Sequence, residues 1–361
     1  MKQIKWVILM GLMSLSLSAC GQKTVETTNS PEVKAETGTA AQAPLETAAQ
    51  APAKAEESKP EYEMIIALHT APGTIEDQAI ERFKEKVEER TNGKVVVNIF
   101  PGAQLGAEKE NLEQMMVGEI QGSIFGDVMT SQLASDLDPT VIPFIYKNVD
   151  DVFSTWNGPI GDKIKQACID KGNIRVVGIG RRGARYLLGN KEMPTPADVK
   201  GVKLRLPEID SWVSIWSTVG ALPTPIAFSE VYSALQTGVC DSFESTLELV
   251  YTGKYYEVQK YAMKTEHLYG LFHFGIAESW LLELPEDMRN IIIEEGDAAC
   301  KWGDEKAANY ESEMAEKLQE NGMTIIDVDK QAYIDAVMPA IEKVAQTWQP
   351  EVWEEVQKYM E

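Results

Sequence analysis

The stretch from residue 203 to residue 244 limits the possible folds of this chain most strongly, because strand and helix patterns alternate along it. An alternating strand is expected over 202–206, and a helix follows that ends at Gly220. Ser229 is placed to cap a second helix, and a further strand is expected over 239–243. A strand, two helices and a strand in this order predict an α/β fold.

The rest of the chain continues this pattern. Strands are expected over 64–68, 95–100, 120–125, 174–179 and 268–277, and helices over 75–91, 107–117 and from Pro285 to about Asn321. Pro223 and Pro225 are expected to stiffen the connection between the two helices of the central stretch. The three cysteines beyond residue 20 have no pairing or metal-ligand spacing, which predicts buried free thiols at Cys168, Cys240 and Cys300.

Two arginines stand where a strand runs or ends. Arg205 lies within the strand expected over 202–206, and Arg185 follows the strand expected over 174–179. A guanidinium in a buried strand needs a carboxylate partner, which either the protein or a ligand can supply. Its planar fork fits one carboxylate with two parallel hydrogen bonds. The pair therefore indicates a site for an organic acid, with a structural Arg–Glu pair as the alternative.

The charge of the chain excludes one class of partner. The 361 residues include 34 basic and 56 acidic side chains, for a net charge of −22. Phosphates would be repelled by such a surface, so no nucleic acid is expected to bind. Any site for an anion must be positive locally. The length allows two domains with separate cores.

The N-terminal segment carries a targeting signal. Residues 1–19 combine a basic start with an apolar run, and Leu17-Ser18-Ala19-Cys20 resembles a lipobox, so Cys20 is expected to carry a lipid. Residues 20–60 contain no aromatic residue, and this composition predicts a disordered linker. We therefore expect an extracytoplasmic protein that is anchored to the membrane by its lipid.

Known motifs for cofactors and catalysis do not explain this chain. Residues 178–183 spell G-x-G-x-x-G, but Gly189 and the prolines at 194 and 196 break the helix that a dinucleotide site would need. Arg181 and Arg182 within it are expected to be surface charges. The three histidines form no H-E-x-x-H, and neither a nucleophile elbow nor a phosphate loop occurs. No enzyme activity, cofactor or metal is expected.

Several long motifs resemble one family. "KGVKLRLP", "GALPTPIAFSEVYSALQTGVCD", "YYEVQKY", "TNGKVVVNIFPGAQLG" and "PFIYKN" resemble the substrate-binding subunits of tripartite ATP-independent periplasmic (TRAP) transporters, of the dicarboxylate-binding type. The resemblance covers most of 61–361. It implies a two-lobed periplasmic binding protein fold with a hinge and a long helix that crosses both lobes. The expected lobes are 61–182 plus 271–310 and 183–270 plus 311–361.

The resemblance also implies roles for particular residues. Arg205 matches the arginine that clamps the substrate carboxylate, Arg185 the arginine that assists it, and Phe228 a wall of the cleft. Ser245 stands where many relatives have asparagine, which leaves room for a bulkier substrate or a water. Glu244 is expected to accept hydrogen bonds from the substrate or to ligate a cation as in some relatives, with ordinary loop chemistry as the alternative.

Two further residues follow strands at the edge where such folds bind ligands. His69 comes after the strand 64–68, and Asp127 lies in a loop after the strand 120–125. Either a pocket role or a structural role fits each residue.

Together these features predict a monomeric solute-binding protein. It is expected to capture a small organic acid between its lobes, close around it, and deliver it to the membrane permease subunits of a TRAP transporter. A sugar acid, a C4-dicarboxylate and a keto acid are all compatible with Arg205. A periplasmic sensor subunit and an extracytoplasmic enzyme that acts on an organic acid remain the alternatives.

Overall fold

The computed structural model describes residues 59–360. The predicted signal peptide, Cys20 and nearly all of the predicted linker lie outside the described residues. The described part forms one compact unit.

Within residues 59–360, ten strands form the sheet framework, and eight of them follow the order β2-β1-β3-β9-β4-β7-β5-β6. The short strand β8 pairs with β4 and β10. The strands are β1 (Tyr62–Leu68), β2 (Val95–Phe100), β3 (Gly122–Phe125), β4 (Ile174–Gly189), β5 (Lys203–Leu206), β6 (Leu222–Pro225), β7 (Ser242–Thr246), β8 (Tyr261–Met263), β9 (Tyr269–Ala277) and β10 (Thr324–Ile326).

The first lobe is built on the parallel strands β2, β1 and β3, and on β9, which runs antiparallel to β3. Its helices are α1 (Ile75–Arg90), α2 (Glu108–Met116), α9 (Glu278–Glu283) and α10 (Glu286–Ala307). Helix α1 packs on α10 and β2 and contributes the buried Phe83, whose ring meets Phe274 of β9 edge-on at 4.9 Å. Thr74 caps α1 by accepting a hydrogen bond from the amide of Asp77.

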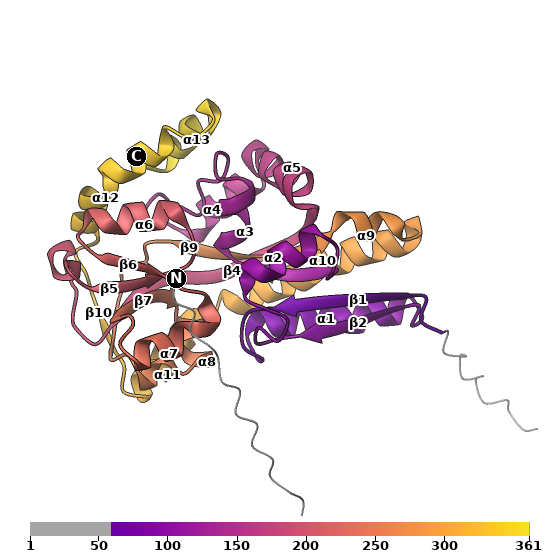
Figure 1. Cartoon of the computed structure of the whole chain (residues 1–361), viewed down its shortest axis with the longest axis horizontal. Coiled ribbons are helices and arrows are strands. Elements are labelled where there is room, and N and C mark those ends of the chain that lie inside the picture. Colours follow the sequence, from indigo (N-terminus) through magenta and orange to yellow (C-terminus); the bar gives the residue numbers. More distant parts are fainter. Residues whose placement is uncertain (1–58, 361) are drawn as a thin grey trace, which may run out of the picture. The chain divides into compact units, whose positions relative to one another are not determined.

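The second lobe is built on β7, β5 and β6 together with β8 and β10. In Figure 1, β5, β6, β7 and β10 lie on the left, and β1 and β2 of the first lobe lie on the right. Its helices are α6 (Asp210–Thr218), α7 (Val231–Gln236), α8 (Leu247–Thr252) and α11 (Tyr310–Glu320). Trp212 and Trp216 of α6 are fully buried, so they belong to the core. The two-lobed α/β fold predicted from the sequence is confirmed.

The remaining elements connect and cover the lobes. They are α3 (Asp127–Leu133), α4 (Val149–Trp156), α5 (Pro159–Gly172), α12 (Lys330–Ala345), α13 (Pro350–Met360) and the short 3₁₀ helices η1 (Pro196–Val199), η2 (Phe228–Glu230) and η3 (Tyr255–Glu257). Helix α12 packs on α6, whereas Glu351 of α13 forms an ion pair with Lys163 of α5.

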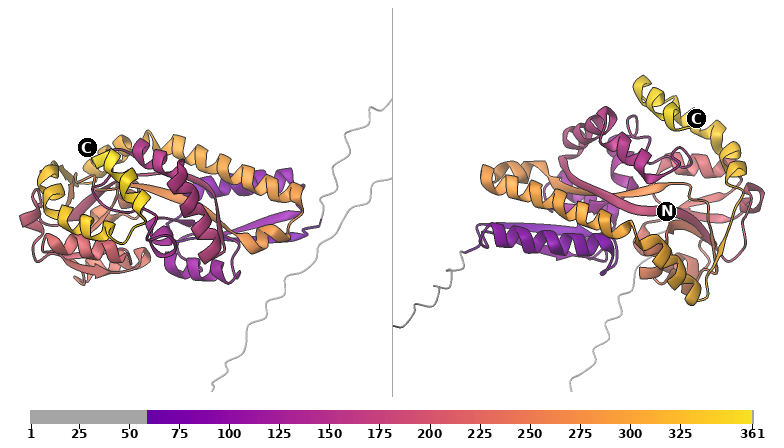
Figure 2. Two further views of the ribbon diagram at one scale, coloured as in Figure 1. Left: turned by 90° about the horizontal axis from the view of Figure 1, so that it is seen from above. Right: turned by 180° about the vertical axis from the view of Figure 1, so that it is seen from behind.

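The chain passes between the lobes along long elements. Strand β4 pairs with β9 as far as Ala184 and with β7 from Arg185 onward. Gly183 lies at this change with φ +110°, a backbone conformation that a side chain would strain. The predicted long helix crosses as well, but it is divided into α10 and α11 by residues 308–309 (Figures 1 and 2).

Several local predictions were wrong for physical reasons. Pro223 and Pro225 lie in strand β6, which tolerates them because it ends the strand order and its edge needs no further amide donors. Ser229 does not cap α7, because a 3₁₀ turn precedes the helix and places Glu230 at the cap. Strand β4 continues far past Ile179, because it pairs in turn with strands of both lobes.

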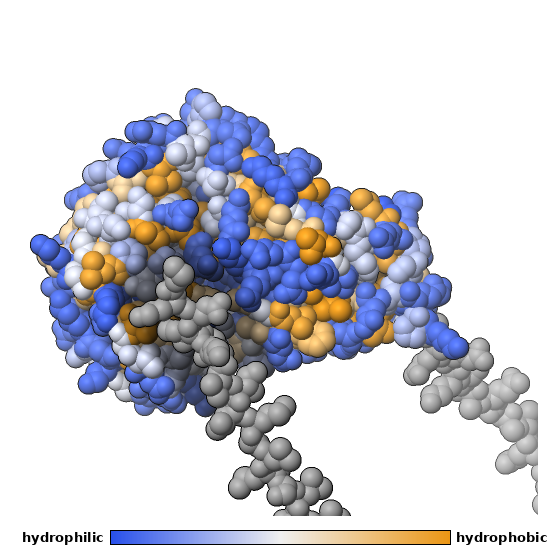
Figure 3. Space-filling view, viewed as in Figure 1, coloured by the Kyte–Doolittle hydropathy of each residue, from blue (hydrophilic) through white to orange (hydrophobic). Residues whose placement is uncertain are grey.

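The prediction for the cysteines was confirmed. Cys168, Cys240 and Cys300 are buried and free. Between residues 59 and 360 no helix has both the length and the apolar character needed to cross a membrane. On the face shown in Figure 3, hydrophobic residues occur in small groups among hydrophilic ones, as is usual for protein surfaces.

Candidate functional site

The ends of strands from both lobes meet around one small cavity. His69 follows β1 and Asp127 follows β3 in the first lobe, while Arg205 lies near the end of β5 in the second. The cavity has a volume of about 30 Å³, enough for one or two water molecules. Its charged and imidazole groups come from His69, Glu108, Asp127, Arg182, Arg185 and Arg205. Five of the seven predicted substrate-binding residues line it, and Phe228 is the fifth.

Arg185 is held by Glu244. The residue lies within β4, whereas the prediction placed it after the end of a strand. Its Nε and Nη2 both donate hydrogen bonds to the carboxylate of Glu244 on β7. Both side chains are buried, and the ring of Trp212 lies 5.1 Å from the Arg185 guanidinium carbon. Burial raises the pKa of Glu244, but the charges and hydrogen bonds of Arg185 and His267 together outweigh burial and hold the pKa below its usual value.

Arg205 has no comparable partner. Its Nε donates to the carbonyl oxygen of Ile226 at 2.8 Å, and its Nη1 lies 4.0 Å from Glu244 Oε1, too far for a hydrogen bond. Only 2% of Arg205 is exposed. Burial lowers the pKa of Arg205 to about 10, with help from the charge of Arg185 and against the attraction of Glu244. This guanidinium is thus buried with hydrogen-bonding capacity to spare.

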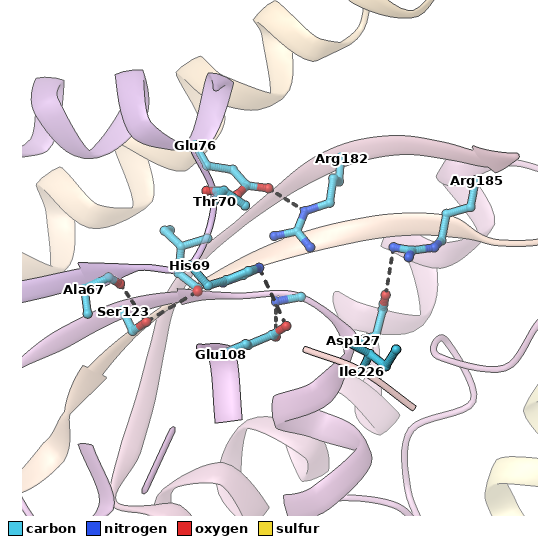
Figure 4. A network of polar contacts seen from close by, with 12 residues as sticks. Ala67, His69, Thr70, Glu76, Glu108, Ser123, Asp127, Arg182, Arg185 and Ile226 are labelled. Atoms are coloured by element: carbon cyan, nitrogen blue, oxygen red, sulfur yellow. Dashed lines mark hydrogen bonds and ion pairs between the residues drawn. The ribbon is translucent and has the colours of Figure 1, made fainter. Parts of the chain in front are cut away.

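The prediction that Arg182 is a surface charge was wrong. Arg182 is 7% exposed and its Nε donates to Glu76, a buried residue of α1 (Figure 4). Arg182 lines the cavity, and its Nη2 has no hydrogen-bond partner among the described residues. Arg181, by contrast, points toward α10 and pairs with the partly exposed Asp304. The rejected dinucleotide motif is part of the continuous strand β4 and begins no helix.

The first lobe supplies an acidic wall. Glu108, at the start of α2, accepts a hydrogen bond from the Gly126 amide at 2.6 Å, and its other oxygen lies 3.7 Å from His69 Nε2 (Figure 4). Asp127 begins α3, where a loop was predicted, and its Oδ2 lies 3.5 Å from Arg185 Nη1. Burial raises the pKa of both carboxyls, that of Asp127 to about 6.

His69 is neutral in this setting, because burial and the nearby Arg182 lower its pKa to about 4. Its Nδ1 has no hydrogen-bond partner among residues 59–360. Sequence reasoning missed Glu108, which carries no local signal beyond its place in the first turn of the helix expected over 107–117.

Phe228 lines the cavity, whereas the other two predicted residues, Ser245 and Glu244, lie on β7 and are not part of its lining. Ser245 is fully buried next to Glu244 on β7, and its hydroxyl has no hydrogen-bond partner in the described part of the chain. The ring of Phe228 lies 5.8 Å from the Arg205 guanidinium carbon and meets the His69 ring edge-on at 6.4 Å. Phe228 therefore lies next to Arg205, the predicted carboxylate clamp of the second lobe, and next to His69 of the first lobe.

Two wider depressions lie outside the cavity, with volumes of about 680 and 670 Å³. Both are lined by Lys109, Glu208 and Pro225. Lys109 of α2 and Glu208 after β5 form an exposed ion pair at 3.8 Å. Since their sequence neighbours Glu108 and Pro207 line the inner cavity, this ion pair joins the two lobes close to that cavity.

The chemistry of the cavity is that of an anion site with an acidic opposite wall. Guanidinium groups gather in the interior of a protein whose net charge is −22. Within residues 59–360, no group of three or more His, Cys, Asp or Glu side chains has the arrangement to hold a metal ion.

Comparison with known proteins identifies the family. Residues 66–347 match the model of the bacterial extracellular solute-binding proteins, family 7. The chain belongs to this family. It is 33% identical over 264 residues to a solute-binding protein of Roseobacter denitrificans, which covers 72% of this chain and 80% of the relative. It is 27% identical over 265 residues to the 2,3-diketo-L-gulonate-binding periplasmic protein of Escherichia coli, which covers 72% and 79%.

Solved structures agree with this assignment. A TRAP periplasmic solute-binding protein of Roseobacter denitrificans with bound L-galactonate has a TM-score of 0.79 and 30% identity, covering 84% of this chain and 100% of that one. A second, from Chromohalobacter salexigens with bound D-glucuronate, has a TM-score of 0.76 and 28% identity, covering 82% and 99%. The predicted membership of the TRAP solute-binding proteins is confirmed, and with it an extracytoplasmic solute-binding protein.

Proposed function

We propose that this solute-binding protein captures a hydroxylated monocarboxylate, a sugar acid, between its lobes and delivers it to a TRAP-type permease. The observation that carries the proposal is the contrast between Arg205, whose guanidinium has unused donors, and the acidic wall of Glu108 and Asp127 across the cavity.

Arg205 would bind the carboxylate of the ligand. Arg182 and Arg185 already donate to Glu76 and Glu244, whereas the two Nη groups of Arg205 have no acceptor within hydrogen-bond distance among the described residues. A carboxylate there would supply the missing counter-charge and two hydrogen bonds. Arg185 would assist by its charge, and Phe228 would pack against the carbon chain of the ligand.

The acidic wall would recognise hydroxyl groups. Carboxylates accept hydrogen bonds, so Glu108 and Asp127 would bind the hydroxyls of a sugar acid, and the free nitrogen of His69 and the free hydroxyl of Ser245 offer further polar contacts. A second carboxylate on the ligand would face Glu108 and Asp127 and be repelled, unless it or they took up a proton. The wall thus disfavours C4-dicarboxylates.

Relatives of this chain support a carboxylate ligand and leave its class open. L-Galactonate and D-glucuronate are bound in two relatives at 30% and 28% identity, whereas a relative from Shewanella loihica at 28% identity is named for C4-dicarboxylates. Since identity does not separate these classes, the charges of the cavity favour the sugar acid.

Binding would require the lobes to open and close. A cavity of about 30 Å³ is smaller than a sugar acid, so the ligand would enter with the lobes apart and the lobes would close around it. We take the lobes as 61–182 plus 271–310 and 183–270 plus 311–361, which is supported by the change of strand partners after Ala184. The protein would perform no chemistry on its ligand. A lipid on Cys20 and the linker up to residue 60 would keep it near the permease.

Titration calorimetry with the full chain tests the ligand class. We expect L-galactonate or D-glucuronate to bind, while succinate and the neutral sugar galactose bind at least tenfold more weakly. Succinate is the control for a second negative charge, and galactose is the control for the absence of a carboxylate. Binding of succinate more tightly than either sugar acid would contradict the proposal.

A further inference from the structure

A buried carboxylate of the second lobe caps a helix of the first. Glu248 of α8 accepts a hydrogen bond from the backbone amide of Ile75, the first residue of α1, at 2.7 Å. Glu248 is 7% exposed and Ile75 is 4% exposed. The two residues are 173 positions apart in the sequence. We call this contact the Glu248 latch.

The contact satisfies a donor that α1 cannot satisfy by itself. The first amides of a helix have no partner within the helix, and its N-terminus carries a partial positive charge. Thr74 accepts from the amide of Asp77 at 3.2 Å, so the cap within the first lobe serves a different amide. The amide of Ile75 receives its acceptor from Glu248 on the other lobe. This bond therefore depends on how the two lobes lie together.

The latch lies where the chain crosses between the lobes. Glu248 and Ile75 line a cavity of about 20 Å³ together with Gly183 of β4 and Ala307, the last residue of α10. Burial and, to a lesser extent, the neighbouring Glu76 raise the pKa of Glu248 to about 7, against the Ile75 amide and Arg182, which lower it. The carboxylate is thus kept from water by groups of both lobes.

The same residues adjoin the ligand cavity. Leu249, next to Glu248 in α8, lines that cavity. Arg182 lines both cavities, and it donates to Glu76, which is next to Ile75 in α1 (Figure 4). A shift of α8 away from α1 would therefore break the latch and move a wall of the ligand cavity at once.

We infer that Glu248 is a positioning residue that favours the closed state by accepting the N-terminal amide of α1 across the lobes. It would slow ligand release without touching the ligand, because release requires the lobes to separate. The ligand readout rests on the proposed function, whereas the contact itself can be tested in the unliganded protein.

The experiment compares Glu248→Ala, which removes the acceptor, with Glu248→Gln, which keeps an acceptor oxygen of the same reach. Hydrogen exchange of the unliganded full chain reports on residues 73–78 at the start of α1, and stopped-flow binding of L-galactonate gives the association and dissociation rates. Glu311→Ala is the matched control, since Glu311 lines the same cavity but bonds to Tyr186 within the second lobe.

We expect Glu248→Ala to speed exchange at residues 73–78 and to raise the dissociation rate roughly 2- to 30-fold, as for the loss of a helix cap, with the association rate unchanged. Glu248→Gln should stay close to the wild type in both readouts, and so should Glu311→Ala. If Glu248→Ala exchanges hydrogen at residues 73–78 as slowly as the wild type, the inference is overturned. It is also overturned if exchange is faster but the dissociation rate of the ligand is unchanged, because Glu248 then has a structural role alone. If the wild type does not bind L-galactonate, the proposed sugar acid is at fault, and the exchange at residues 73–78 alone decides whether the latch exists.

Discussion

The guanidinium of Arg185 and the carboxylate of Glu244 form a buried two-point ion pair between the adjacent strands β4 and β7. Arg205 is also close, but its Nη1 lies 4.0 Å from Oε1 of the same carboxylate. From the sequence, both arginines are candidates for an organic-acid site, with Arg205 expected to clamp the carboxylate and Arg185 to assist. The structure gives Arg185 a carboxylate of the protein, so that of these two arginines Arg205 is the one with hydrogen-bonding capacity for a ligand.

Breaking the Arg185–Glu244 pair should destabilise the fold. We expect Glu244→Gln to lower the free energy of unfolding by about 3–5 kcal/mol, because the charge of Arg185 would remain buried without its counter-charge. Urea denaturation of the full chain measures this change. Glu208→Gln is the control, since Glu208 belongs to an exposed ion pair and should change stability by about 1 kcal/mol or less. Equal effects of the two substitutions would contradict this account.

Much of the fold could be predicted, because its signals are local. The short apolar runs of 64–68 and 95–100 and the amphipathic pattern of 75–91 are local signals of burial, and the structure forms β1, β2 and α1 there. The positions of His69 and Asp127 at the cavity followed from the rule that ligands bind at the carboxyl ends of parallel strands.

The parts that escaped prediction depend on distant partners. Arg182 is buried because Glu76, 106 residues away, neutralises it, and no local pattern signals that pairing. Glu108 is a pocket carboxylate because α2 directs it toward Gly126 and His69. Strand β6 contains two prolines because it ends the strand order, and position in a sheet is a tertiary property.

Asp127 should make stability depend on pH in an unusual direction. Its pKa in the folded protein is about 6, above the usual value near 3.9, so the folded state binds a proton more tightly than the unfolded chain. This group therefore favours folding below about pH 4 and loses that contribution as the pH rises through 6.

Asp127→Asn removes this titration. Relative to the wild type, the variant should gain up to roughly 2–3 kcal/mol at pH 8 and show no gain at pH 4, because a shift of one pKa unit corresponds to about 1.4 kcal/mol. Denaturation of both proteins across this range measures the difference, in which the titrating groups that do not interact with Asp127 cancel. A difference that does not change with pH would disprove the shifted pKa.

Lipidation of Cys20 predicts how the protein partitions. Cys20→Ala should leave the precursor unprocessed at that position or release the protein from the membrane fraction, since cleavage and lipid attachment both need the thiol. Fractionation and intact-mass measurement of the two proteins test this. The buried Cys168 serves as the control, because Cys168→Ser should not alter the membrane fraction. Unchanged processing and attachment in Cys20→Ala would rule out the lipoprotein.

Arg205 provides the sharpest test of the site. A hydrogen bond to a charged group contributes roughly 1.5–3 kcal/mol, so Arg205→Lys should weaken binding of L-galactonate about 10- to 150-fold, because lysine offers a point charge in place of a two-point fork. Arg205→Ala should weaken it further, since the ligand carboxylate would be buried without a counter-charge.

Arg185→Lys is the comparison: it should lower the melting temperature more and the affinity less, because Glu244 already occupies that fork. Calorimetric titration and a thermal melt on the same samples separate the two effects. A lower melting temperature with wild-type affinity in Arg205→Lys would show that Arg205, like Arg185, is a structural charge, and would remove the main support for a carboxylate ligand at this cavity.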